Sequence, residues 1–242
     1  MTASRNVPKG ILFDKDGTLF DYAKSWSSIN REAGHLAAAG QPDLAARLLD
    51  LAGADPTTGL AVADSLLAAG NAAEIAAAWV AAGSPLDEAQ LTRALDELFR
   101  DGVSRMVPVT DLLALFTRLR SRGLSLGIAS SDSQRAIEDT LVHFGLSTMV
   151  DFIAGYDSGH GFKPEPGMAL AFCKACCLHP HEIAMVGDNL HDMHMGRRAG
   201  AGWRIGVLTG TGTRQSLTPH SDTVLNSIAE LEDTLFSPNY KG

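Results

Sequence analysis

The feature that most constrains the fold is an alternation of short apolar runs with helical stretches in the second half of the chain. Helical periodicity recurs between these runs, and the runs themselves lie after Pro108, at residues 124–129, 151–154, 183–186 and 203–208. Short strands that alternate with helices are typical of a parallel sheet with helices on both faces. The sequence therefore predicts an α/β fold with a Rossmann-like core.

A further apolar run, residues 10–13, stands apart from this alternation and ends at a polar loop. The segment that separates it from the other runs is rich in alanine and leucine and has helical periodicity, broken at glycines and prolines. We therefore expect two domains. The α/β core comprises residues 1–20 and 107–242, and an inserted α-helical domain comprises residues 21–106.

Composition excludes several classes of protein. Apolar residues make up 45% of the 242 residues and charged residues 20%, as in ordinary globular proteins. Twenty Lys and Arg against 28 Asp and Glu give 20 − 28 = −8, which argues against a nucleic-acid partner. No segment is apolar for long enough to predict membrane insertion. The oligomeric state stays open.

The three cysteines lie within five positions, at Cys173, Cys176 and Cys177. They cannot link distant parts of the chain, so a reducing, cytoplasmic location is expected. A second pair of zinc ligands at suitable spacing is missing, and the segment is predicted to be helical. We therefore expect core or half-buried cysteines and not a zinc site.

In open parallel sheets, ligands bind beyond the carboxyl ends of the strands, close to helix N-termini. Phosphoryl transfer needs a nucleophile, positive charge near the phosphoryl oxygens, a proton donor and a cation that offsets the acidic groups. Polar residues that meet these needs follow the apolar runs or precede a helix: Asp14, Asp16, Ser130, Ser131, Lys163, Asp188 and Asp192.

The aspartates in this set point to a metal. The carboxylates of Asp14 and Asp188 would repel a phosphate unless a hard cation lay between them, and Mg²⁺ is commonly held by one or two carboxylates together with phosphate oxygens. Asp16 lies two residues beyond Asp14 at a turn. There it is expected to serve as an acid and then as a base towards the leaving group.

Four motifs occur in a fixed order: Phe-Asp-Lys-Asp-Gly-Thr-Leu at 13–19, Ile-Ala-Ser-Ser-Asp-Ser at 128–133, Lys-Pro-Glu-Pro at 163–166 and Val-Gly-Asp-Asn-Leu-His-Asp at 186–192. In this combination the chain resembles the haloacid dehalogenase superfamily, and within it the phosphoglycolate phosphatase-like branch with a helical, C1-type cap. The resemblance implies a Mg²⁺-dependent phosphatase that hydrolyses a small, phosphoglycolate-like phosphomonoester through an aspartyl phosphate. Dehalogenases and phosphonatases lack the carboxylate that corresponds to Asp16, which favours phosphate esters. Two departures are Lys15, where many relatives have an apolar residue, and Ser130, where threonine is frequent.

The resemblance also implies a role for each site residue. Asp14 is the nucleophile, and Asp16 is the acid and base. Mg²⁺ binds the Asp14 carboxylate, the Asp16 carbonyl and Asp188, and Asp192 orients metal-bound water. The residues expected to bind the phosphoryl group are Thr18, Ser130, Ser131 and Lys163.

Alternatives remain open at this stage. A phosphosugar mutase would return the phosphoryl group to a sugar, and a phospho-accepting signalling module or a purely binding protein would not turn over. Substrate choice belongs to the cap, where the candidates are Tyr22, Trp26, Arg31, His35 and the loop 53–59. His191 and His194 are expected at solvent-facing positions on a helix.

Overall fold

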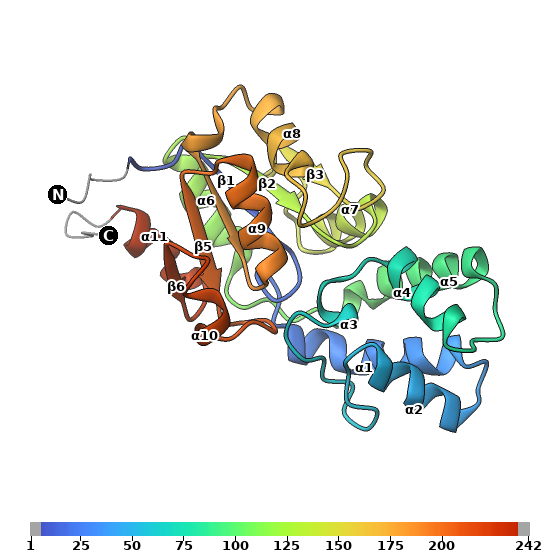
Figure 1. Ribbon diagram of the computed structural model, residues 1–242. Helices are drawn as coiled ribbons and strands as arrows, with labels where there is room; N and C mark the ends of the chain where they lie inside the picture. Colours follow the sequence, from blue (N-terminus) through green and yellow to red (C-terminus); the bar gives the residue numbers. More distant parts are fainter. Residues whose placement is uncertain (1–5, 237–242) are drawn as a thin grey trace.

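The computed structural model describes residues 6–236 and contains a six-stranded parallel sheet (Figure 1). The strand order is β3-β2-β1-β4-β5-β6, the doubly wound order that binds ligands where the order reverses. This confirms the predicted fold class. The strands are β1 (Gly10–Phe13), β2 (Ser125–Ala129), β3 (Phe152–Ala154), β4 (Ile183–Gly187), β5 (Trp203–Val207) and β6 (Thr223–Leu225).

The two central strands, β1 and β4, lie side by side and are buried along their whole length. Phe13 is in register with Val186, so both strands end at the same level of the sheet. The residues that follow them, Asp14 and Asp188, therefore emerge together at the edge where the strand order reverses. This register is the reason that two aspartates 174 positions apart in the sequence, since 188 − 14 = 174, belong to one site.

Helices cover both faces of the sheet. Ile11 and Phe13 belong to the core cluster that also contains residues of α6 (Leu112–Ser121) and α7 (Gln134–His143). Leu12 belongs to the opposite cluster, with residues of α8 (Gly167–Ala175) and α9 (Leu190–Ala199). Side chains of a strand alternate between faces, so β1 contributes to both layers. The short helices α10 (Arg214–Leu217) and α11 (Leu231–Phe236) complete the C-terminal part.

Five helices lie in the chain between β1 and α6, and we call them the helical insert. They form a group beside the sheet (Figure 1), and side-chain caps begin three of them. Asn71 and Glu74, for example, form a capping box. The helices are α1 (Tyr22–Ala37), α2 (Pro42–Leu51), α3 (Leu66–Ala69), α4 (Ala72–Ala81) and α5 (Glu88–Asp101).

The two segments that join the insert to the sheet run next to each other. The Val109 amide donates to the Leu19 carbonyl at 3.0 Å, and the Asp21 amide donates to the Val107 carbonyl at 2.9 Å. A short 3₁₀ helix, Gly102–Arg105, leads from α5 into the second segment. Paired connectors give the insert a narrow attachment to the sheet.

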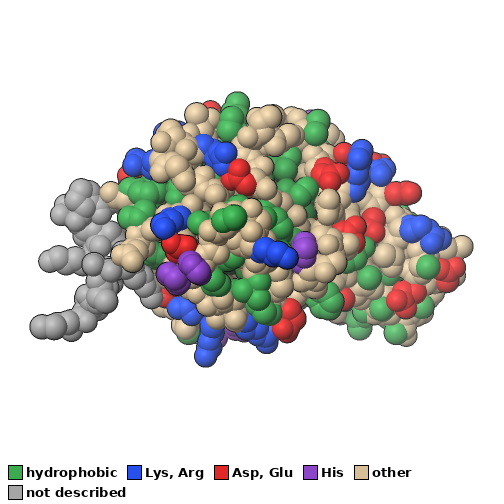
Figure 2. All heavy atoms as spheres, turned by 90° about the horizontal axis from the view of Figure 1, so that it is seen from above, with side chains coloured by type: hydrophobic (Ala, Val, Ile, Leu, Met, Phe, Trp, Pro, Cys, Tyr) green, Lys and Arg blue, Asp and Glu red, His purple; other side chains and the backbone are tan. Residues whose placement is uncertain are grey.

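The remaining surface features bear on what the chain contacts. Acidic and basic side chains are interspersed on the face drawn in Figure 2. Within residues 6–236 no helix has the length and apolar character that crossing a bilayer requires.

Cys173 is buried and Cys176 half-buried, as predicted, whereas Cys177 is exposed because the chain leaves α8 there with a φ of 55°. The prediction for Cys177 was wrong.

Candidate active site

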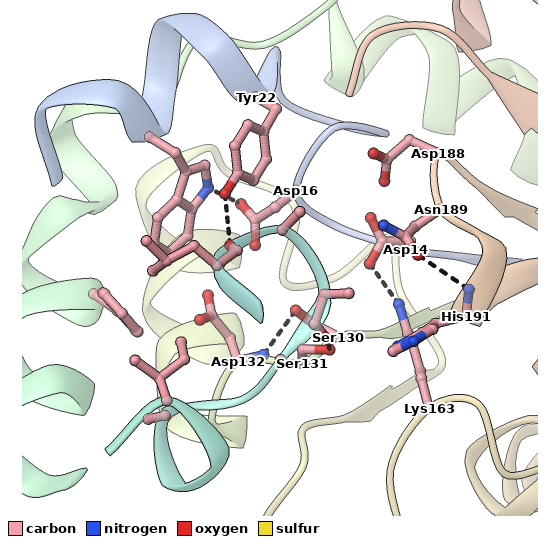
Figure 3. A pocket seen from close by; sticks show the side chains of 18 of the residues that line it. Asp14, Asp16, Tyr22, Ser130, Ser131, Asp132, Lys163, Asp188, Asn189 and His191 are labelled. Atoms are coloured by element: carbon pink, nitrogen blue, oxygen red, sulfur yellow. Dashed lines mark hydrogen bonds and ion pairs between the residues drawn. The ribbon is translucent and has the colours of Figure 1, made fainter. Parts of the chain in front are cut away.

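A pocket lies between the carboxyl ends of the central strands and the helical insert (Figure 3). Asp14, Lys163, Asp188 and Asn189 lie on one side of this view, and Asp16 lies with Tyr22 on the other. The side chains that line it come from both parts of the chain: Asp14, Asp16, Ser130, Ser131, Asp132, Lys163, Asp188, Asn189, His191 and Asp192 from the core, and Tyr22, Trp26, Asn30, Leu67, Ala68, Ala69, Gly70, Ala72, Ile75, Asp96 and Phe99 from the insert.

Asp14, directly after β1, is held by a buried lysine. Its Oδ1 lies 2.5 Å from Lys163 Nζ, which also lies 2.6 Å from Asp192 Oδ1. Burial alone would lower the pKa of Lys163, but the Asp14 and Asp192 carboxylates outweigh it and raise that pKa. Lys163 therefore remains an ammonium. The second carboxylate oxygen of Asp14, Oδ2, has no hydrogen-bond partner.

Asp188, directly after β4, is fixed by the loop that follows β5. Its Oδ2 accepts a hydrogen bond from the Thr211 amide at 2.8 Å. Asp192, in the first turn of α9, accepts a hydrogen bond from the Asn189 amide at 3.1 Å and completes a capping box with it. Helix capping and the glycine-rich loop 206–212 thus set the positions of two site carboxylates.

The buried acidic charge at this end exceeds the buried basic charge. Asp14, Asp188 and Asp192 are at most 6% exposed, and Lys163 is the cation among them, which leaves 1 − 3 = −2. Burial raises the pKa of Asp14 to about 7, and burial followed by the Asp14 charge raises the pKa of Asp188 well above its usual range. Such an excess is costly unless a cation offsets it.

These carboxylates fit a bound metal ion. Asp14, Asp188 and Asp192 each offer one oxygen, and the three oxygens lie within 4.8 Å of one another. All-oxygen donors of this kind suit Mg²⁺. The unpartnered Oδ2 of Asp14 is an available ligand. The ion itself would neutralise the excess charge and polarise phosphate oxygens.

Gly210 makes a testable contribution to this arrangement. A Cβ at this position would lie 1.9 Å from Asp188 Oδ2, so Gly210→Ala is expected to displace Asp188 and to raise the concentration of divalent cation needed for half-maximal hydrolase activity at least about tenfold. Titration of activity with Mg²⁺ measures this shift. Gly206→Ala is the control, because its Cβ meets the Ser221 hydroxyl at 3.0 Å and no site residue. An unchanged Mg²⁺ requirement in Gly210→Ala would contradict the role given to the loop.

Asp16 is held on the opposite side of the pocket by a second buried lysine. Lys15 Nζ lies 2.7 Å from Asp16 Oδ2 and 2.9 Å from Asp132 Oδ2, and Trp26 Nε1 donates to Asp16 Oδ1 at 2.7 Å. Lys15 is 1% exposed, and its pKa is raised because the two carboxylates outweigh the effect of burial. Asp16 is therefore fixed between the core and α1 of the insert.

The hydroxyl residues proposed for phosphate binding differ in position. Ser130 lines the pocket, and its Oγ accepts a hydrogen bond from the Asp132 amide at 3.1 Å. Ser131 also lines it, but its hydroxyl donates to the Ala69 carbonyl of α3 at 3.0 Å. Thr18 is fully buried outside the pocket lining, with no partner for its hydroxyl. Both serines therefore line the pocket, whereas Thr18 does not.

Sequence reasoning missed several pocket residues. His191 lines the pocket and has a buried Nδ1 without a partner, so its predicted solvent-facing position was wrong. His194 is half-buried beside His220. Asp132 pairs with Lys15, and its signal was its place in the second motif beside Ser130 and Ser131. His191 had a comparable signal, because it lies in the fourth motif next to Asp192.

Among the substrate-choice candidates, Tyr22 and Trp26 line the pocket. Arg31 and His35, further along α1, do not, and neither does the loop 53–59. Arg31 instead donates to the Thr57 carbonyl within the insert. Tyr22, Trp26 and Asn30 therefore belong to the face of α1 that lines the pocket, whereas Arg31 and His35 are exposed on another face of the helix.

The sequence model of the haloacid dehalogenase-like hydrolase family matches residues 8–200 of this chain. The chain belongs to this family. Among curated relatives, the phosphoglycolate phosphatase of Yersinia pestis is 28% identical over 96% of this chain and 95% of its own length. The phosphoglycolate phosphatase of Chromobacterium violaceum is 32% identical, but that match spans 48% of this chain and about half, 51%, of the relative. These matches place the hydrolase in the phosphoglycolate phosphatase-like branch.

The fold is shared with solved structures of the family. CbbY of Rhodobacter sphaeroides, crystallised with phosphate, superimposes with a TM-score of 0.70 and covers 93% of this chain and 96% of its own. The two sequences are 22% identical, so this likeness concerns the fold alone.

Proposed function

We propose that this hydrolase is a Mg²⁺-dependent phosphatase that hydrolyses a small phosphomonoester through an aspartyl phosphate on Asp14. The observation that most supports this is the group formed by Asp14, Lys163, Asp188 and Asp192 at the ends of β1 and β4. It combines a carboxylate nucleophile, a fixed ammonium and an excess of acidic charge that a hard cation would offset. Relatives named phosphoglycolate phosphatase make phosphoglycolate the reference substrate.

The proposed reaction consists of two half-reactions. In the first, Asp14 attacks phosphorus, Lys163 stabilises the phosphoryl oxygens, and Asp16 gives a proton to the departing alkoxide. In the second, Asp16 removes a proton from water, which attacks phosphorus and releases inorganic phosphate and the Asp14 carboxylate. Ser130 would bind a phosphoryl oxygen, and the Asp14 carboxylate, the Asp16 carbonyl and Asp188 would hold the metal, with Asp192 orienting its water.

We also propose that residues 21–106 act as a cap whose position governs access of water. The paired connectors at 19–21 and 107–109 are its hinge, and the bond from Trp26 to Asp16 links the cap to the acid and base residue. A closed cap would exclude water while the phosphoryl group moves to Asp14. An open cap would admit the water that hydrolyses the aspartyl phosphate. Such a motion would break the hydrogen bonds that join insert and core at Trp26, Ala69 and Asp96.

A phosphosugar mutase is the main alternative, since it uses the same phosphoaspartate and returns the phosphoryl group to a sugar. A receiver-like signalling module would hold a phosphoaspartate without an adjoining substrate pocket. Here a pocket lined by residues of both the core and the insert adjoins Asp14. Sustained release of inorganic phosphate separates a phosphatase from all of these alternatives.

Removal of metal supplies the test. With Mg²⁺ present, steady release of inorganic phosphate from p-nitrophenyl phosphate and from a panel of small phosphomonoesters is expected. A chelator should reduce the rate at least about a hundredfold, and excess Mg²⁺ should restore it, because the buried acidic excess otherwise repels phosphate. A rate unaffected by chelation would contradict the metal role, and no release from any compound would contradict the phosphatase assignment.

A further inference from the structure

The end of the pocket formed by the helical insert differs in chemistry from the end at the sheet. Three aromatic side chains, Tyr22, Trp26 and Phe99, line it together with Leu67 and Ile75. Tyr22 stacks on Trp26 with ring centroids 6.2 Å apart, and Phe99 meets the edge of Trp26 at 5.1 Å. This wall offers an apolar surface to whatever group is attached to the phosphate.

The polar groups at this end are acceptors of hydrogen bonds. Asn30 is fully buried, and its amide nitrogen donates to the Gly59 carbonyl at 2.9 Å, which identifies the remaining atom as the oxygen. That oxygen has no partner. Asp96 of α5 accepts from the Tyr156 hydroxyl at 2.9 Å. A buried acceptor without a partner is costly, and a ligand with a donor would satisfy it.

The described cations near the pocket are already paired with carboxylates: Lys15 Nζ lies 5.6 Å from the Trp26 ring centroid but is held by Asp16 and Asp132. Lys163 is the one lysine or arginine among the described residues that line the pocket, and it is paired with Asp14 and Asp192 at the sheet end. None of the described lysines or arginines forms an ion pair with Asp96. A carboxylate on the leaving group would thus face Asp96 without a positive partner.

Resting on the proposed phosphatase function, we infer that the substrate's leaving group has an apolar face, at least one O–H or N–H donor for Asn30 and Asp96, and no carboxylate. The family reference compound, phosphoglycolate, places a carboxylate where the insert supplies acceptors. Burial raises the pKa of Asp96 to about 6, so an assay at pH 8 keeps its charge and makes the discrimination largest.

Three compounds of nearly equal size test the end group: 2-phosphoglycolate, 2-hydroxyethyl phosphate and O-phosphoethanolamine. A fourth, 4-(hydroxymethyl)benzyl phosphate, tests the apolar face. With Mg²⁺ at pH 8, we expect kcat/KM at least about tenfold higher for the hydroxyl and ammonium compounds than for 2-phosphoglycolate. The benzyl compound should exceed 2-hydroxyethyl phosphate by a similar factor because it contacts the aromatic wall.

Two variants locate the effect. Asp96→Asn should bring the ratio of hydroxyethyl to glycolate rates towards one, because it removes the opposing charge. Asp101→Asn removes the same charge from an exposed position of α5, 72% exposed, and should leave the ratio unchanged. A glycolate rate equal to or above the others, or an unchanged ratio in Asp96→Asn, overturns the inference. Failure of every compound, p-nitrophenyl phosphate included, overturns the proposed function instead.

Discussion

Replacement of Asp14 by asparagine is expected to lower kcat by a factor on the order of 10⁴ or more, because an amide oxygen is a poor nucleophile for phosphorus. Loss of a single nucleophile has effects of this size in other enzymes that form covalent intermediates. The measurement is steady-state release of inorganic phosphate, with the mass of the variant checked to exclude deamidation back to aspartate.

The fold should survive this substitution. Burial raises the pKa of Asp14 to about 7, so in the metal-free protein the charged carboxylate is less favourable than in water. Asparagine reduces the buried excess from −2 to −1, and the Tm of the metal-free variant is expected to equal or exceed that of the unmodified protein. Near-normal turnover in the folded variant would contradict the assignment of Asp14 as nucleophile.

Replacement of Lys15 by methionine is expected to reduce the free energy of unfolding by about 3–5 kcal/mol, since it leaves two buried carboxylates without their ammonium partner. Lys15 Nζ contacts Asp16 and Asp132 within 2.9 Å, and the side chains of all three are at most 16% exposed. Methionine has a similar length and an apolar character. Urea unfolding measures the change.

Two further variants test this account of Lys15. Lys24→Met breaks an exposed pair with Asp21, in which the lysine is 67% exposed, and should cost about 0–1 kcal/mol. The double variant Lys15→Met/Asp132→Asn should lose less free energy of unfolding than the sum of the losses in the two single variants, because each single change removes the same ion pair. A loss for Lys15→Met no greater than for Lys24→Met would show that the buried triad contributes little.

The parts of the fold that sequence predicted are those with strong local signals. Residues 10–13 and 183–186 are apolar throughout because their strands are covered on both faces, so each stands out in the sequence as a continuous apolar run. The edge strand β6 was not predicted, because its three residues begin with Thr223 and lie between the polar residues Asp222 and Asn226. The other edge strand, β3, is equally short and exposed, but its residues are all apolar, so a run was visible at 151–154.

The candidate site shows the same division. Asp14, Asp188 and Lys163 follow from strand ends and motifs, and the sheet order brings them together. Pairing of Lys15 with Asp132 depends on two loops separated by 117 positions, since 132 − 15 = 117, and no local pattern encodes it. Exposure of Cys177 depends on where α8 ends, which is a feature that periodicity locates poorly.

The central claim, a covalent phosphoryl group on Asp14, is tested most directly by oxygen exchange between phosphate and water. Inorganic phosphate labelled with ¹⁸O at all four positions is incubated with the enzyme and Mg²⁺, without any alcohol, and its mass distribution is followed. Attack by Asp14 expels one labelled oxygen as water, and hydrolysis returns an unlabelled one. We predict stepwise loss of label with the unmodified enzyme and none with Asp14→Asn. Hydrolysis of phosphomonoesters without exchange, or exchange that persists in Asp14→Asn, would contradict the account.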